Sequence, residues 1–346
     1  MRNNTRVGSI FAIFIFLYCC TWFAASQWVY NQTIIFLSQI HGERIKFNYT
    51  SLERGGFPFS LDWHLLQPTI SVMFLNKEIR GKANRTTLSI NPFSRNTVTL
   101  NNQAPIVVLI NKEKKIKLQM GSESNTLMVN INSSDVIKID YGFKNFKIDR
   151  RIPNGKNKNW KQVSSTKSFF GTLKFPKIMK KEFLDNLYLF SFEMNDVSLA
   201  DKNLLSIETL NKVSGLIRVQ GNLGNFNLED LVTWRDKGGV LDLETLRMQW
   251  KPHKLVIKGT LALDEGLKPI GAGTIDFNGI DYFLADQMKT GKLNKAEAKV
   301  AKLAIRLLTQ PKELLDKSMI RIPITAQNGK LKAGPFSLVD LPGLIR

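Results

Sequence analysis

Residues 57–65 read Phe-Pro-Phe-Ser-Leu-Asp-Trp-His-Leu, with an apolar residue at every odd position. Successive side chains of a β-strand point to opposite faces of a sheet, so this alternation predicts a strand with one apolar and one polar face. Phe57, Phe59 and Trp63 are expected on the apolar face. Pro58 has no backbone N–H to donate, which places it at the start of a strand or at a sheet edge.

The same period-two pattern recurs along most of the chain, at residues 45–49, 116–120, 127–131, 137–141, 188–192 and 320–324. Short strands at close spacing, with few helices between them, are typical of antiparallel sheets. The pairs Asn278-Gly279 and Asn328-Gly329 are typical of hairpin turns. We therefore expect a mainly β fold (β-rich α+β), in which an N-terminal transmembrane helix is followed by a long curved antiparallel sheet with a few packing helices.

Three helices are predicted. The first continues from the apolar N-terminal segment towards Ile40. The second covers residues 228–237, between a possible cap at Asn227 and the pair Gly238-Gly239. The third covers residues 295–309, where Asn294 and Glu297 have the spacing of a capping box.

The N-terminal segment is long and apolar enough to cross a bilayer. Residues 7–30 contain no charged side chain, and a span needs about 20 residues. Arg2 and Arg6 precede it, and because basic residues stay in the cytoplasm, the rest of the chain is expected to be exported. The residues assigned to this membrane anchor are Val7, Ile10, Phe14, Leu17 and Trp22. A cleaved signal peptide is the alternative, since Ala24-Ala25-Ser26 has the small residues of a cleavage site.

The exported part is basic and lacks cysteine. Both cysteines, Cys19 and Cys20, lie inside the apolar segment, so no disulfide can stabilise the remainder. Arg2 and Arg6 are two of the 49 basic residues, and all 29 acidic residues follow the anchor, which leaves a net charge of +18 outside the cytoplasm. Such a positive charge would favour contact with anionic lipid headgroups. Codon bias is the alternative explanation for the excess of basic residues. No nucleic-acid-binding motif is present.

The sequence offers no clear catalytic or cofactor site. His41, His64 and His253 lack the spacing of metal ligands, so no metal and no cofactor are expected. Asp62 and His64 share the polar face of the predicted strand, where they are either an acid–base pair or two solvent-facing residues. Gly271-Ala272-Gly273-Thr274 is expected to lie between strands as a turn.

We expect four segments. Residues 1–30 form the cytoplasmic tip and the transmembrane anchor. Residues 31–150 form an N-terminal β-rich half, and residues 151–167, which are polar and basic, form a loop or linker. Residues 168–346 form a C-terminal β-rich half that contains the second and third helices.

Two stretches and a tail carry a family resemblance. Residues 49–70 hold the motif Gly55-Gly56-Phe57-Pro58-Phe59 and end in Gln67-Pro68. Residues 250–279 hold Gly259-Thr260-Leu261, Pro269 and Gly271, and the tail holds Asn328-Gly329, Gly334-Pro335 and Leu341-Pro342. Together with the anchor, these motifs resemble the alphaproteobacterial domain-of-unknown-function family numbered 2125. The resemblance implies a periplasmic protein anchored in the inner membrane, and it implies no reaction. The strand–Gly-Thr-Leu–strand pattern is also similar to the sheets of AsmA-like envelope proteins, which shelter lipid chains.

From these observations we expect a non-enzymatic, inner-membrane-anchored periplasmic protein of envelope maintenance. An apolar sheet face must be covered by another element, another chain or a lipid, and this sequence has few helices to cover its strands. Phospholipid or another envelope lipid, held on such a face, is therefore the expected partner besides the membrane itself. The alternatives are a scaffold or partner-binding module with a closed core, and a hydrolase whose site the sequence does not reveal.

Overall fold

The structure, a computed structural model of the chain, describes residues 2–40, 45–74, 77–91, 93, 97–111, 116–130, 136–151, 159–200, 209–224, 228–289, 291, 294–308, 319–333 and 336–341. Strands hold most of the described residues, and the strand pairs are antiparallel. The mainly β fold class is thereby confirmed. The chain divides into two compact units, residues 1–132 with 151–158 and residues 133–150 with 159–346.

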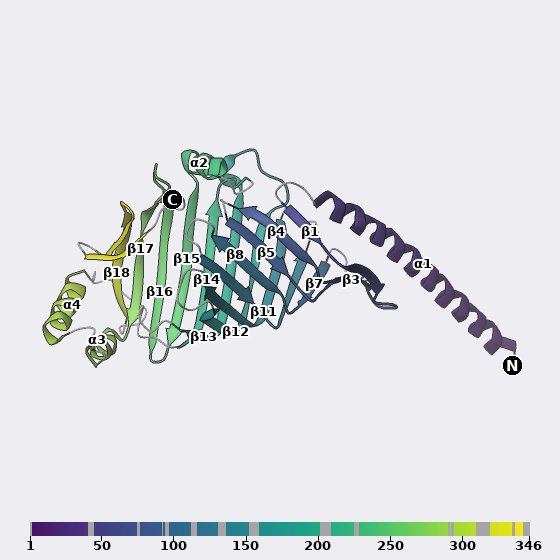
Figure 1. Cartoon of the computed structure of the whole chain (residues 1–346), viewed down its shortest axis with the longest axis horizontal. Coiled ribbons are helices and arrows are strands. Elements are labelled where there is room, and N and C mark those ends of the chain that lie inside the picture. The colour runs from purple at the N-terminus through teal and green to yellow at the C-terminus, as the bar shows by residue number, and fades with distance from the viewer. Residues whose placement is uncertain are drawn as a thin grey trace. The chain divides into compact units, whose positions relative to one another are not determined.

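The described residues of the first unit form one long helix and ten strands. Figure 1 shows α1 and several of these strands. The elements are α1 (Arg2–Ile40), β1 (Ile45–Asn48), β2 (Ser51–Gly55), β3 (Leu61–Leu66), β4 (Thr69–Phe74), β5 (Lys77–Lys82), β6 (Arg85–Ile90), β7 (Thr97–Gln103), β8 (Ile106–Asn111), β9 (Ile116–Gly121) and β10 (Ser124–Asn130). α1 contains the candidate membrane span Ala12–Ile35, whose mean hydropathy is 1.5.

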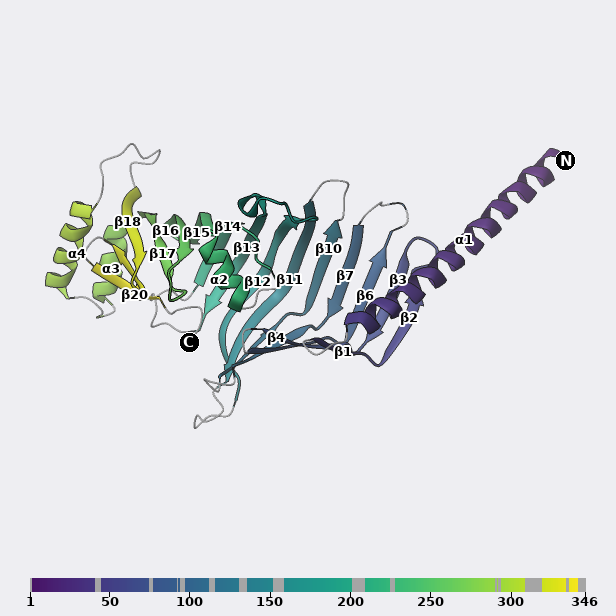
Figure 2. The same ribbon diagram turned by 90° about the horizontal axis from the view of Figure 1, so that it is seen from above.

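The ten strands pair in two rows that meet along a crease. One row has the order β2-β3-β6-β7-β10, and the other has the order β1-β4-β5-β8-β9. The chain passes from one row to the other between β1 and β2, β3 and β4, β5 and β6, β7 and β8, and β9 and β10, each time within two residues. The ten strands therefore form five long strands that are bent at their middles, and Figure 2 shows β6, β7 and β10 running in a different direction from β1 and β4.

Backbone hydrogen bonds continue through the crease. The N–H of Gln67 donates to the carbonyl of Asn84 at 2.9 Å, and the N–H of Ala83 donates to the carbonyl of Pro68 at 3.1 Å. One bend further, the N–H of Ala104 donates to the carbonyl of Glu123 at 3.1 Å. Gln67 and Ala104 have φ values of 49° and 47°, so the bend is made by single residues in the left-handed region.

α1 packs on the row that contains β3. Trp22 is buried against Leu61 and Trp63, and its indole N–H donates to the carbonyl of Ser60 at 3.1 Å. Trp63 is fully buried. The apolar side predicted for Leu61, Trp63 and Leu65 is confirmed, since all three are buried along β3 while the residues between them are half-buried.

The prediction of a strand beginning at Phe57 is wrong. Residues 57–59 form a turn, and β3 begins at Leu61. Gly56 has a φ of 91°, and its carbonyl accepts from the N–H groups of Phe59 and Ser60, which closes the turn. Phe57 is 49% exposed and Phe59 76% exposed, so these two side chains do not belong to the core. The alternation continues in the sequence, but the turn hydrogen bonds at Gly56 prevent ladder pairing.

The second unit is an antiparallel meander with three α-helices (Figure 1). Its elements are β11 (Val136–Arg151), β12 (Lys161–Pro176), the short 3-10 helix Phe183–Asp185, β13 (Leu187–Leu199), β14 (Thr209–Gln220), α2 (Leu228–Asp236), β15 (Val240–Trp250), β16 (His253–Leu263), β17 (Pro269–Asn278), α3 (Ile280–Lys289), α4 (Lys295–Leu308), β18 (Met319–Gln327), β19 (Lys330–Ala333) and β20 (Phe336–Asp340). Each strand from β11 to β19 pairs with the next along the chain.

One face of this meander carries a row of apolar side chains from β11 to β18. Register places apolar residues opposite one another from strand to strand, as in the row Phe143, Phe169, Met194, Val213, Met248, Leu255, Phe277 and Ile320. Aromatic rings gather on this face, where Phe143 and Phe169 stack with centroids 5.4 Å apart. Many of these side chains are only half-buried.

Several local expectations for the second unit are confirmed and others are corrected. The capping box of α4 is present, since Asn294 Oδ1 accepts from the N–H of Glu297 and Glu297 Oε2 accepts from the N–H of Asn294, both at 2.8 Å. Asn328 and Gly329, with φ values of 54° and 69°, form the hairpin between β18 and β19. Asn278-Gly279 is not a hairpin, because α3, which the sequence analysis missed, begins at the next residue.

Two further predictions are wrong in part. The prediction of a turn at residues 271–274 is wrong, because these residues lie inside β17, where Gly273 pairs with Gly259 and leaves room for close backbone approach. Of the loop or linker predicted at 151–167, residues 152–158 lie outside the described residues, and residues 161–167 form the first part of β12. Ladder pairing of β12 with β11 accounts for this, because Lys161 and Gln162 are opposite Arg150 and Asp149. The second helix ends at Asp236, and its possible cap Asn227 lies outside the described residues.

We expect Trp63→Ala to lower the free energy of unfolding by about 3–5 kcal/mol, because a fully buried indole leaves a cavity when it is removed. Trp28→Ala is the matched control, since Trp28 is 65% exposed on α1. The measurement is urea denaturation of the purified full-length protein in mild detergent. Equal losses for the two variants would contradict the packing of β3 described above.

We expect Gly171→Ala to destabilise the second unit by about 1–3 kcal/mol, because there is no space for the added methyl group. A Cβ atom on Gly171 would lie 2.0 Å from the carbonyl oxygen of Ser191 and 2.5 Å from the hydroxyl of Tyr141. Gly142→Ala, on the neighbouring strand, is the control, because a Cβ atom there meets nothing within 4 Å. Thermal unfolding followed by circular dichroism separates the two variants, and a Gly171→Ala protein as stable as Gly142→Ala would refute the close approach.

Candidate functional site

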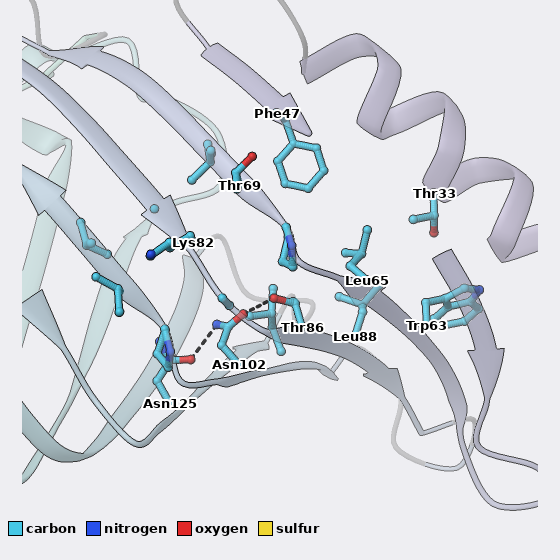
Figure 3. Close-up of a pocket in the computed structure, with 18 residues that line it drawn as sticks. Thr33, Phe47, Trp63, Leu65, Thr69, Lys82, Thr86, Leu88, Asn102 and Asn125 are labelled. Carbon is cyan, nitrogen blue, oxygen red and sulfur yellow. Dashed lines mark hydrogen bonds between the residues drawn. The ribbon is translucent and has the colours of Figure 1, made fainter. Parts of the chain in front are cut away.

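The crease of the first unit contains a groove of about 360 Å³ (Figure 3). Both rows of strands contribute to it. From the β3 row come Trp63, Leu65, Leu88 and Leu100, and from the β1 row come Phe47, Ile70, Gly81 and Val107. Pro68, Ala83 and Pro105 lie at the bends themselves, and Thr33 of α1 lies at one side.

Strand register explains why the groove is apolar. Phe47, Ile70, Gly81 and Val107 are successive partners across β1, β4, β5 and β8. Trp63, Leu88 and Leu100 are successive partners across β3, β6 and β7. Because side chains alternate along a strand, the residues two positions further from the crease lie on the same face. These are also apolar: Ile45, Val72, Ile79, Leu109 and Leu118 in one row, and Leu61, Ile90, Val98 and Val129 in the other.

A short chain of polar side chains crosses this apolar lining next to the crease. The hydroxyl of buried Thr86 donates to Asn102 Oδ1 at 2.5 Å, and the amide of Asn102 donates to Asn125 Oδ1 at 2.6 Å (Figure 3). These three residues face one another on β6, β7 and β10. The three side chains are neutral and are hydrogen-bonded to one another, so the chain adds polar groups but no charge to the groove.

Among the described residues that line the groove, Lys82 carries a charge. Lys82 ends β5, immediately before the bend at Ala83, and its side chain is exposed. Thr69, its partner on β4, lines the groove beside it. The groove therefore has an apolar body and one cationic position at its edge.

Asp62 and His64 lie on the opposite face of β3 from the groove. The ring of His64 makes its hydrogen bond to the hydroxyl of Thr87, with Nδ1 and Oγ1 2.9 Å apart. Burial, and next the positive charge of Arg85, lower the pKa of His64 below its usual value of 6.5, against smaller opposing effects of Asp62 and Glu53. The acid–base pair considered from the sequence thus consists of two neighbours on the outer face of a strand, with His64 bonded to a threonine.

Three residues of the motifs singled out in the sequence, Gly259, Pro269 and Gly271, lie in strands of the second unit. Gly259 is in β16, Pro269 and Gly271 are in β17, and all three contribute to strand pairing. Burial raises the pKa of Tyr141 to about 12, and its hydroxyl donates to the carbonyl of Ser191 at 3.1 Å. Within the part of the chain that the structure describes, no three His, Cys, Asp or Glu side chains gather as metal ligands would.

The alternation of residues 57–65 predicts the apolar positions of Trp63 and Leu65, but it does not predict the groove that they line. A signal for the bends is nevertheless present, since Gln67-Pro68 and Ala104-Pro105 interrupt two strand patterns at the crease. Proline cannot donate to a ladder, and the residue before it is restricted in conformation. The residues assigned to the anchor differ in their packing. Trp22 packs on Trp63, while Phe14 and Leu17 are exposed on α1. Val7 and Ile10 belong to α1, and their side chains lie outside the description.

Comparison with protein families gives a match over the C-terminal region. Residues 186–342 match the model of a family described as an uncharacterized protein conserved in bacteria, DUF2125. The match confirms the family resemblance drawn from the motifs, over a region that lies in the second unit and includes Gly259, Pro269 and Asn328. Neither comparison with curated proteins nor comparison with solved structures gives a match. The groove at residues 33–125 lies before the matched region.

The lowered pKa of His64 predicts a specific pH dependence of stability. Below pH 6.5 the unfolded chain takes up a proton on His64 that the folded chain still excludes, so the free energy of unfolding falls as the pH falls through this window. His64→Gln keeps a polar side chain beside Thr87 and removes the titration. Denaturation between pH 5 and 7.5 should show a shallower pH dependence for this variant, and an unchanged slope would contradict the assignment.

Proposed function

We propose that the first unit holds an acyl chain of a membrane lipid in its crease, as part of a non-enzymatic, inner-membrane-anchored periplasmic protein of bacterial envelope maintenance. The observation that carries the proposal is the groove between the two strand rows. It is open to solvent, its volume of about 360 Å³ lies within the range of about 300–1,000 Å³ for ligand pockets, and its lining is mostly aliphatic and aromatic.

The shape of the apolar surface favours a chain over a compact ligand. Apolar partners continue outward from the crease in a second row on each wall, for example Ile79 beyond Gly81 and Ile90 beyond Leu88. The rows also continue across successive strands, which lie about 4.8 Å apart. An extended hydrocarbon can therefore contact several strands at once, and burial of apolar surface contributes about 25 cal/mol for each Å² removed from water.

The charges around the groove suit an anionic headgroup. Lys82 lies at the edge of the groove, where a phosphate could pair with its ammonium group while the acyl chain occupies the apolar part. The exported part of the chain carries +18 in total, and basic residues near a membrane surface each contribute about 1 kcal/mol of attraction to anionic lipid. The net charge supports proximity to the membrane, and Lys82 supplies the local contact.

The N-terminal helix supports a location beside the membrane. A helix with an apolar stretch from Ala12 to Ile35 can serve as a membrane anchor or as a signal sequence. We favour the anchor, because Trp22 and Ser26 of this helix are buried against the folded unit and cleavage at residues 24–26 would remove Trp22. With Arg2 and Arg6 in the cytoplasm, the groove would then be on the periplasmic side.

We expect Leu100→Asp to abolish lipid binding, because it places a carboxylate in the middle of the apolar wall. Asn101→Asp is the matched control on the same strand: Asn101 is exposed on the outer face, and its Oδ1 accepts from Thr126, a role that aspartate retains. Full-length protein is purified from membranes in mild detergent, and bound lipid is measured by mass spectrometry after denaturation.

The expected result is phospholipid near one or more molecules per chain for the wild type and for Asn101→Asp, and loss of that lipid for Leu100→Asp. Gly81→Leu is a second test that introduces no charge, since a side chain at Gly81 would fill the groove beside Ile70. A folded wild type that carries no lipid and takes up none from labelled vesicles would refute the proposal. A scaffold with an empty groove would then explain the fold.

A further inference from the structure

Exposed aromatic side chains lie where the strands β3 and β6 end on the side away from the crease. Phe57 and Phe59, in the turn before β3, are 49% and 76% exposed. Phe93, which follows β6, is 74% exposed, and the end of β6 pairs with the start of β3 through Ile90 and Leu61. Aromatic side chains exposed to this degree are typical of an interaction surface or a membrane interface.

This turn is attached to α1 at one level of the helix. The hydroxyl of Tyr18 donates to the carbonyl of Pro58, and the indole of Trp22 donates to the carbonyl of Ser60. Phe57 packs edge-on against Trp22 at 5.2 Å and stacks with Phe23 at 6.1 Å between ring centroids. The position of residues 56–60 along the helix is therefore fixed between Tyr18 and Phe23.

The length of α1 places that level inside the bilayer. From Arg6 to Tyr18 the helix rises about 18 Å, and from Arg6 to Phe23 about 26 Å, at 1.5 Å per residue. The hydrocarbon core is about 30 Å thick. If Arg6 stays at the cytoplasmic surface, the segment from Tyr18 to Phe23 has not yet left the hydrocarbon core, and helix tilt would place it deeper still.

The turn is built to tolerate that environment. Pro58 has no N–H, its carbonyl accepts from Tyr18, and the carbonyl of Ser60 accepts from Trp22. The N–H groups of Phe59 and Ser60 both donate to the carbonyl of Gly56 at 3.0 and 2.8 Å. These polar groups have internal partners, which an apolar medium requires.

We propose that the turn at residues 56–60 is inserted into the periplasmic leaflet of the membrane, with Phe57 and Phe59 among the acyl chains and Phe93 at the interface beside them. The inference rests on the uncleaved anchor in the proposed function, and it does not require a lipid in the groove. It also deepens that function. On the inner face, Ile90 and Val98 lie at the same end as the turn and lead to Leu88 and Leu100 of the groove. A lipid leaving the leaflet would then have an apolar path of one strand length.

The test measures the depth of residue 59 in a bilayer. In a full-length protein carrying Cys19→Ser and Cys20→Ser, Phe59→Cys is labelled with a nitrobenzoxadiazole dye and the protein is reconstituted into phosphatidylcholine–phosphatidylglycerol vesicles. Glu123→Cys is the matched control, because Glu123 is exposed at the crease, away from the turn. Phe93→Cys is the second site, in case the label at residue 59 disturbs folding.

We expect lipids brominated on their acyl chains to quench most of the emission from residue 59, part of that from residue 93, and little of that from residue 123. Iodide in the aqueous phase should show the reverse order. A label at residue 59 that iodide quenches as strongly as at residue 123 would overturn the proposal. Protection from both quenchers would also overturn it, because it would indicate a protein contact such as a second copy. Lipid retention in the groove is a separate readout, so either idea can fail while the other stands.

Discussion

The first unit depends on keeping the strand ladder hydrogen-bonded while every strand bends. A corner in a sheet normally exposes unpaired N–H and carbonyl groups, each of which costs free energy when buried. Here the bend takes only two residues per strand, and pairs such as Gln67 with Asn84 and Ala104 with Glu123 continue the bonding through it. Because these backbone hydrogen bonds are kept, the inner faces of the two rows can approach one another. The alternation of apolar residues that buries Trp63 also places the apolar side chains that line the groove.

This arrangement links the helix to the groove through one residue. Trp63 is covered by Trp22 of α1 on one side and lines the groove on the other. The helix is therefore part of the folded unit as well as a candidate membrane span. Under the proposed function, a membrane anchor that packs in this way holds the groove at a defined height, whereas a flexible tether would only keep it near the membrane.

The sequence predicted the elements better than their arrangement. Period-two alternation is a local property, so strands such as residues 137–141 and the capping box at Asn294 and Glu297 could be read directly. The groove depends on which strands pair across the crease, and β3 with β6 or β5 with β8 are contacts that alternation does not encode. The prediction of a strand at Phe57 is wrong for the opposite reason. The alternation there is genuine, but the φ of 91° at Gly56 and the contacts to Tyr18 and Trp22 hold these residues in a turn.

The apolar sheet face is covered to different degrees in the two units. In the first, the sheet folds so that its apolar face meets itself and leaves a narrow groove. In the second, a row such as Phe143, Phe169 and Met194 continues across the meander, and many of its side chains are half-buried. The helices there offer limited cover: α2 packs through Trp234, whose indole N–H donates to the carbonyl of Gln220, and α4 contacts β18. Half-buried aromatic rows and a folded groove both leave apolar surface exposed to solvent, and this shared property is the physical basis of the proposed lipid binding.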